Sequence, residues 1–152
     1  MQQRNRWMIG ILIIASLLTA VACTATSSRA TKEEPATVEP IEGTDLSRVI
    51  LTAKASERLG IETALVRQAE VGPAGGEAAL RKVIPYAAVL YDPNGNTFVY
   101  TNGEPFTFVR APITVDYIEG ELAILHDGPP SGTAVVTVGA AELYGTEFGV
   151  GK

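Results

Sequence analysis

The sequence predicts a mostly β protein: a small antiparallel β-barrel or sandwich with one short helix, preceded by a signal peptide and a disordered tether. Two observations predict the β fold. Between residues 82 and 141, short runs of β-branched and aromatic residues alternate with turn-forming clusters, which recur about every ten residues. Within this stretch, residues 113–117 alternate between apolar and polar side chains, which is the period of a half-buried strand.

The first part of the folded region has two expected strands around the expected helix. Residues 49–51 are β-branched or apolar and predict a strand. Residues 53–59 predict a short helix, because Thr52 is a suitable N-cap and Gly60 a suitable stop. Residues 61–71 alternate again and predict a second strand.

The second part has only strands and turns. A loop at residues 72–76, rich in Gly and Pro, leads into it, and Pro85 excludes the first run from a helix interior. The turns between the runs are built from Asn, Asp, Gly and Pro. Strands are expected at residues 83–91, 97–101, 106–118, 122–125 and 133–138.

The first 22 residues have the pattern of a signal peptide. Arg4 and Arg6 precede an uncharged apolar run at residues 7–22, which is shorter than the roughly 20 residues of a membrane-spanning helix. Small residues then precede Cys23, the only cysteine. This junction resembles a bacterial lipobox, although Ala20 stands where leucine is usual. The resemblance implies that Cys23 is acylated and anchors the chain on the extracytoplasmic face of a bacterial membrane. A plain cleaved signal peptide, or an uncleaved anchor, is the alternative.

Amino-acid composition divides residues 23–152 into three segments. Residues 23–44 are rich in Thr, Ser, Ala, Pro and Glu without apolar periodicity, so a flexible tether is expected there. Residues 45–148 are expected to form one β-rich domain, and residues 149–152 a tail. Without the leader, 10 basic residues face 17 acidic ones, a net charge of −7 that disfavours nucleic acid and a polybasic membrane patch.

Six segments from both parts of the folded region carry a family resemblance: residues 49–52, 59–64, 84–90, 98–100, 109–110 and 132–139. They resemble the membrane-proximal domain of periplasmic adaptor subunits (membrane-fusion proteins) of RND-type tripartite efflux pumps. In that family the two parts meet in space as one β-domain, and lipoyl, helical-hairpin and β-barrel domains are inserted between them. Here about a dozen residues, 69–80, separate the parts. The resemblance therefore implies a stand-alone membrane-proximal domain that lacks the lipoyl and hairpin domains.

Sequence motifs for catalysis or metal binding are weak. Residues 92–96 open like a calcium loop, but Thr97 and Gly103 stand where its glycine and its bidentate glutamate belong, so a hairpin turn is expected. The only histidine, His126, has no nucleophile motif with it, and the acidic residues at 116–127 are expected to be solvated. No catalytic, metal or cofactor residue is predicted; the predicted site residue is Cys23, as a lipidation site.

The predicted function is a non-enzymatic, membrane-anchored lipoprotein that acts as an adaptor-like binding module. Its expected partners are membrane lipid, through Cys23, and an integral membrane transporter or another envelope protein. Some of the nine Tyr and Phe side chains between residues 86 and 148 are candidates for a docking face, because aromatic residues are enriched at interfaces. The alternative is an extracytoplasmic ligand-binding or sensory lipoprotein.

Overall fold

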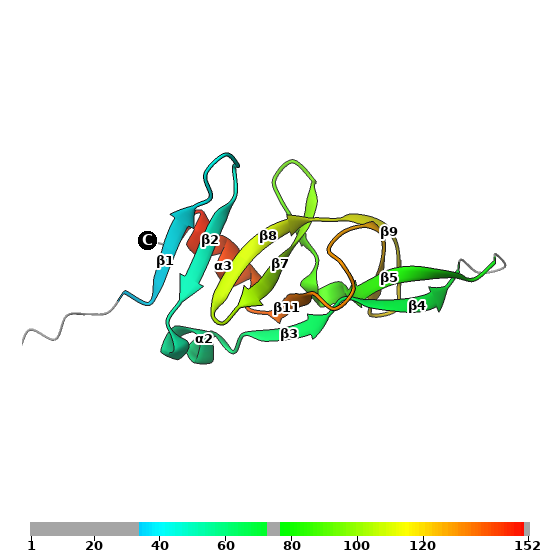
Figure 1. Cartoon of the computed structure of the whole chain (residues 1–152), viewed down its shortest axis with the longest axis horizontal. Helices are drawn as coiled ribbons and strands as arrows, with labels where there is room; N and C mark the ends of the chain where they lie inside the picture. Colours follow the sequence, from blue (N-terminus) through cyan, green and yellow to red (C-terminus); the bar gives the residue numbers. More distant parts are fainter. Residues whose placement is uncertain (1–33, 73–76, 151–152) are drawn as a thin grey trace, which may run out of the picture. The chain divides into compact units, whose positions relative to one another are not determined.

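Eleven strands and two α-helices make up the described part of the chain (Figure 1). The computed structural model describes residues 34–72 and 77–150. The predicted signal peptide, the predicted lipidation site Cys23 and the first half of the predicted tether, residues 23–33, lie outside the described residues. The described residues belong to one compact unit.

The strands form two antiparallel sheets. The larger sheet, sheet A, has the order β1-β2-β8-β7-β11-β3, with the short β6 also paired to β7. Its strands are β1 (Ala36–Pro40), β2 (Ser47–Leu51), β3 (Glu62–Leu65), β6 (Leu90–Tyr91), β7 (Thr97–Glu104), β8 (Thr107–Pro112) and β11 (Ala134–Val138). The smaller sheet, sheet B, has the order β4-β5-β10-β9. Its strands are β4 (Arg67–Val71), β5 (Ala79–Pro85), β9 (Thr114–Glu119) and β10 (Leu122–Asp127).

Two apolar clusters hold the layers together. Val99 and Val135 of sheet A pack with Ile84 and Leu125 of sheet B in one cluster. The neighbours of Val99 in β7 point to the other face, as strand alternation requires. There Phe98 and Tyr100 join a second cluster with the two helices. Sheet A therefore lies between sheet B and the helices, and the described part of the chain is a sandwich with no closed barrel.

The helices show what local signals specify and what they miss. Helix α2 (Ala53–Leu59) is confirmed: the Thr52 hydroxyl accepts a bond from the Ala55 N–H at 3.1 Å, and Gly60 ends the helix in the left-handed conformation with φ 62°. A second helix, α3 (Ala140–Glu147), was not predicted. No side chain caps its start, and its stability comes from tertiary burial, since Leu143 is fully buried.

The predicted tether extended too far. Strand β1 lies inside residues 23–44 and pairs with all five residues of β2. The expectation of disorder was wrong for this segment, because an edge strand with one packed face needs little apolar periodicity of its own. The only residue of β1 that packs on the core is Ala36.

Three predicted strands each divide in two. Residues 61–71 become β3 and β4, which belong to different sheets. At the crossing, the Val66 side chain is buried, and its N–H and C=O bond to Thr133 and Gly132 at 2.8 Å each. Residues 106–118 likewise become β8 and β9 on either side of buried Ile113. Residues 83–91 become part of β5, a 3₁₀ turn (Tyr86–Ala88) and β6.

The two parts of the folded region pair with each other, as expected. Strand β2 pairs with β8, β3 with β11 and β4 with β5. The first part thus contributes strands to both sheets, and neither sheet is complete without it.

Candidate binding site

A buried ion pair joins helix α3 to sheet A. Arg110 of β8 donates from Nε to both carboxylate oxygens of Glu147 at 2.9 Å each. The Tyr100 hydroxyl of β7 donates to the same carboxylate at 2.5 Å. The Glu147 side chain is 2 % exposed and that of Arg110 is 16 % exposed, so this pair is largely withdrawn from water.

Aromatic rings enclose the guanidinium. Its Cζ lies 5.6 Å from the Phe98 ring centroid and 5.0 Å from that of Phe148, distances typical of cation–π contacts. Tyr144 lies against both rings, at 5.7 Å from Phe98 and 4.6 Å from Phe148. Phe148 is 52 % exposed, so the outermost ring of this stack faces solvent.

Burial is the main cause of the raised pKa of Tyr100. Burial first, and then the bond to ionised Glu147, raise the pKa of Tyr100 above its ordinary value of 10.0. The phenol therefore stays neutral and acts as a donor to the carboxylate. Together, Tyr100, Arg110 and Glu147 fix the C-terminal end of α3 on the sheet.

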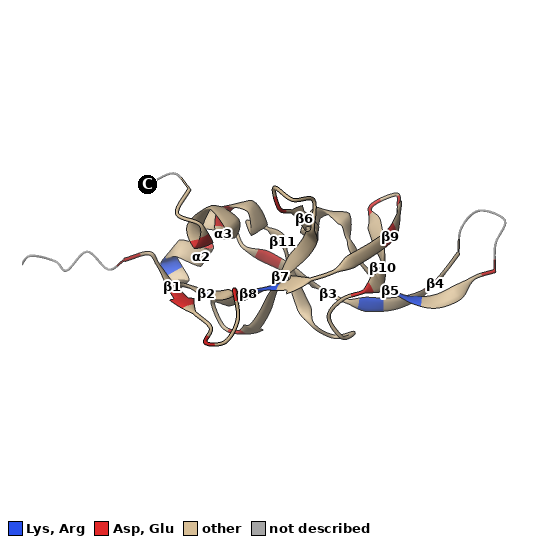
Figure 2. Ribbon diagram, turned by 90° about the horizontal axis from the view of Figure 1, so that it is seen from above, with Lys and Arg blue, Asp and Glu red and all other residues tan. Residues whose placement is uncertain are grey.

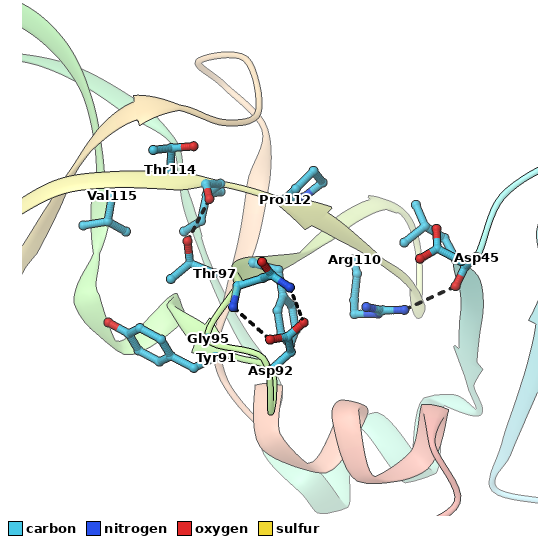
Figure 3. Close-up of a pocket in the computed structure, with 13 residues that line it drawn as sticks. Asp45, Tyr91, Asp92, Gly95, Thr97, Arg110, Pro112, Thr114 and Val115 are labelled. Atoms are coloured by element: carbon cyan, nitrogen blue, oxygen red, sulfur yellow. Dashed lines mark hydrogen bonds between the residues drawn. The ribbon is translucent and has the colours of Figure 1, made fainter.

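An open hollow of about 800 Å³ lies beside this cluster, between the β6–β7 turn, the β8–β9 junction and the loop before β2 (Figure 3). The Arg110 side chain extends along it toward the Asp45 backbone carbonyl, with a longer Nη2–O contact of 3.4 Å. Its wall is stiffened at Thr97, whose hydroxyl donates to the Ile113 carbonyl at 2.7 Å. The volume lies within the range of small-molecule sites, about 300–1,000 Å³.

The segment that opens like a calcium loop is a hairpin turn, as predicted, and lies at the rim of this hollow. The Asp92 carboxylate accepts bonds from the Asn94 N–H, the Asn96 N–H and the Asn96 side-chain amide, each at 2.8 Å. The bond from the Asn96 side chain contributes most to lowering the pKa of Asp92 below its ordinary value. In Figure 3 the carboxylate points into its own loop, so its charge stabilises the turn itself.

The remaining candidates are dispersed. His126 is exposed near the end of β10. Asp127 bonds the Gly128 N–H at 2.8 Å and lies 3.8 Å from the Lys82 ammonium, and Asp116 pairs with Arg81. Within residues 34–72 and 77–150, no three acidic, His or Cys side chains gather as a metal site, and no helix is both long and apolar enough to cross a bilayer.

The sequence did not show which of the nine Tyr and Phe side chains belong to the core, and fewer of them are buried than their strand positions led us to expect. Phe98, Tyr100 and Phe108 are buried, whereas Tyr86, Tyr91, Phe106 and Phe148 are exposed. The ion pair was missed, because Arg110 and Glu147 lie 37 residues apart and because Glu147 belongs to a helix that the sequence did not predict. The spacing of Tyr144 and Phe148, four residues apart, was the available signal, since such residues meet on one helical face.

Comparisons with protein-family models, curated proteins and solved structures found no match. The resemblance to adaptor subunits therefore stays a prediction from the quoted segments.

Proposed function

We propose that this chain is a membrane-anchored lipoprotein that acts as an adaptor-like binding module and docks on an integral membrane protein of the cell envelope. It performs no chemistry of its own. The observation that carries the proposal is the pairing of the two sequence parts into one β unit, through β2–β8, β3–β11 and β4–β5. Such a union is what the likeness to membrane-proximal adaptor domains implies.

The position of the folded unit relative to Cys23 supports this proposal. Strand β1 begins at Ala36, so far fewer residues separate the proposed acylation site from the fold than a tether ending at residue 44 would provide. A chain spans at most about 3.4 Å per residue, so the start of the described residues lies within about 40 Å of a lipid-anchored Cys23. Two acyl chains suffice for stable anchoring.

Photo-crosslinking in cells tests the docking. The photo-crosslinking probe is placed at exposed Glu104, the last residue of β7, or at exposed Phe106 in the β7–β8 turn. Asn102 is avoided, because its side-chain amide donates to the Glu104 and Thr107 carbonyls at 2.7 and 3.0 Å. We expect both positions to capture the same integral membrane protein. The Cys23→Ser variant, released from the membrane, should lose this product. Capture of no membrane protein from either position would overturn the proposal.

The hollow beside Arg110 favours a second candidate, a ligand-binding or sensory lipoprotein. Its volume of about 800 Å³ and its mixed lining suit a small solute. Saturable binding of a solute by the purified chain, weakened by a substitution such as Thr114→Trp in the hollow, would favour this candidate over docking.

A further inference from the structure

Strand β4 is an edge of sheet B, and the register shows which of its backbone groups face outward. The N–H of Tyr86, the residue directly after β5, donates to the Glu121 carbonyl at 2.8 Å, so the backbone groups at this position point toward β10. Successive residues of a strand direct their N–H and C=O groups to opposite sides. Arg81 and Val83, of opposite parity to Tyr86, therefore direct theirs toward β4.

The same alternation assigns the groups of β4. Ala69 lies opposite Arg81 in the register and so bonds toward β5. Gln68 and Glu70 then direct their N–H and C=O groups to the outer side. Val66, which has the same parity, bonds on that side to the loop before β11. Beyond Val66, the described sheet ends at β4, so the outward groups of Gln68 and Glu70 meet no further strand.

The other strands at the ends of the two described sheets, β1, β3 and β9, carry features that discourage strand addition, and β4 has fewer of them. Strand β1 is flanked by Pro35 and ends in Pro40. Register shifts interrupt the pairing of β9 with β10 and of the four-residue β3 with β11. Strand β4 contains no proline, and its five-residue register with β5 is unbroken. Proline, bulges and short length are the usual means of blocking edge-to-edge pairing.

We propose that β4 pairs antiparallel with β4 of a second copy of this chain, about a two-fold axis at Ala69. Such an axis stands normal to the sheet, so residues of the same parity face each other across it. A two-fold axis at Arg67 would place two arginines opposite each other, and an axis at Glu70 would place two glutamates opposite each other. An axis at Gln68 would pair only residues 67–69, because Val66 already bonds to the loop before β11. Centring on Ala69 pairs all five residues and opposes no like charges.

This register satisfies the outward groups. Gln68 of each copy lies opposite Glu70 of the other, and the two residues exchange backbone hydrogen bonds. The Gln68 amide is placed to donate to the Glu70 carboxylate across the axis. Ala69 faces its own counterpart in the close, non-hydrogen-bonded position, about 4.5 Å between Cα atoms, and its small side chain fits there.

The position of the strand leaves it accessible. The β4–β5 hairpin extends away from β1 and α3 in both views, and basic as well as acidic positions mark it (Figures 1 and 2). An interface of five residues per copy is small and weak, so the dimer forms only where the chain is held at a high local concentration. The high local concentration at a membrane rests on the proposed lipid anchor; the register itself does not.

Cysteine crosslinking of the full chain in membranes tests the register. Ala69→Cys should give a disulfide-linked dimer on mild oxidation, because the paired Cα atoms fall within the 4.4–6.8 Å that a disulfide spans. Gln68→Cys is the register control, since its copies lie diagonally, about 7–8 Å apart. Thr37→Cys on β1 is the edge control. We expect at least fivefold more dimer from Ala69→Cys than from either control, with the thermal melt unchanged.

Equal crosslinking at positions 68 and 69 would mean random collision and would overturn the proposal. Absence of an Ala69→Cys dimer, both in membranes and in concentrated detergent solution, would also overturn it. Capture of another protein through Ala69→Cys would assign the edge to a partner's strand instead of a second copy. A dimer of the unsubstituted chain would report a free Cys23 thiol, which bears on the lipid anchor and not on β4.

Discussion

Replacing Glu147 by glutamine should lower the free energy of unfolding by about 3 kcal/mol. Removing one partner of a buried ion pair costs about 3–5 kcal/mol, because the remaining charge stays out of water. The low end applies here: Arg110 is 16 % exposed and keeps its contacts with the Phe98 and Phe148 rings. The substitution conserves shape, so the loss reports the charge.

The matched control is Glu39→Gln. Glu39 pairs with Arg48 at 3.5 Å, but the two side chains are 50 % and 43 % exposed. Exposed pairs contribute about 0–1 kcal/mol, so this variant should be nearly neutral. Urea unfolding followed by circular dichroism measures both variants. A 3 kcal/mol loss should also lower the Tm by about 10 °C or more in a domain of this size.

A double-mutant cycle with Arg110→Met isolates the pair. Arg110→Met alone leaves Glu147 buried without its counter-charge, so the double variant should be less destabilised than the sum of the single variants. Equal losses for Glu147→Gln and Glu39→Gln, or strict additivity in the cycle, would show that burial does not make this pair important for stability.

Three further predictions concern pH and backbone. The raised pKa of Tyr100 means that its contribution to stability is present below pH 10.0 and is lost as the pH rises further, so ultraviolet titration should show its phenolate forming only with unfolding. The lowered pKa of Asp92 has the opposite sign: its contribution is present above pH 3.8 and is lost below it, and the Asn96 amide resonance should shift there. Gly139→Ala should destabilise slightly more than Gly95→Ala in urea unfolding. Both glycines have φ near 85°, a strain of about 1–2 kcal/mol for alanine. At Gly139 a Cβ would also lie 2.3 Å from Ile61 Cδ1, and this flexible end of a side chain must shift to make room, whereas a Cβ at Gly95 meets no atom within 4 Å. Equal losses would contradict the steric part of that argument.

Local signals predicted the parts of the fold that they determine. Thr52 and Gly60 delimit α2 because the cap and the left-handed stop are properties of single residues. The Asp92 turn was predictable for the same reason. Alternation identified most strands, but it could not show that the chain changes sheets at Val66 and Ile113. Ile113 continues the alternation with Val115, and Val66 directly follows another apolar residue, so neither marks a boundary in the sequence. Their burial depends on which layer covers them.

Helix α3 and strand β1 show the limit of sequence reasoning in this chain. Neither has the periodicity that marks a helix or a strand, and each is stabilised by what it packs on. Leu143 is the only residue of α3 with no exposed surface, and Glu147 is bonded to Tyr100 of β7 and Arg110 of β8. The candidate site depends on this helix, so it became visible only in three dimensions.

Metabolic labelling with a palmitate analogue, combined with membrane fractionation, tests most directly whether this is a membrane-tethered binding module. The wild-type chain should carry the label and sediment with membranes. The Cys23→Ser variant should be unlabelled, while the β unit, which begins well after this position, keeps its melting temperature. A wild-type chain that is unlabelled, or that is found free in the medium, would show that Cys23 does not anchor the protein in a membrane.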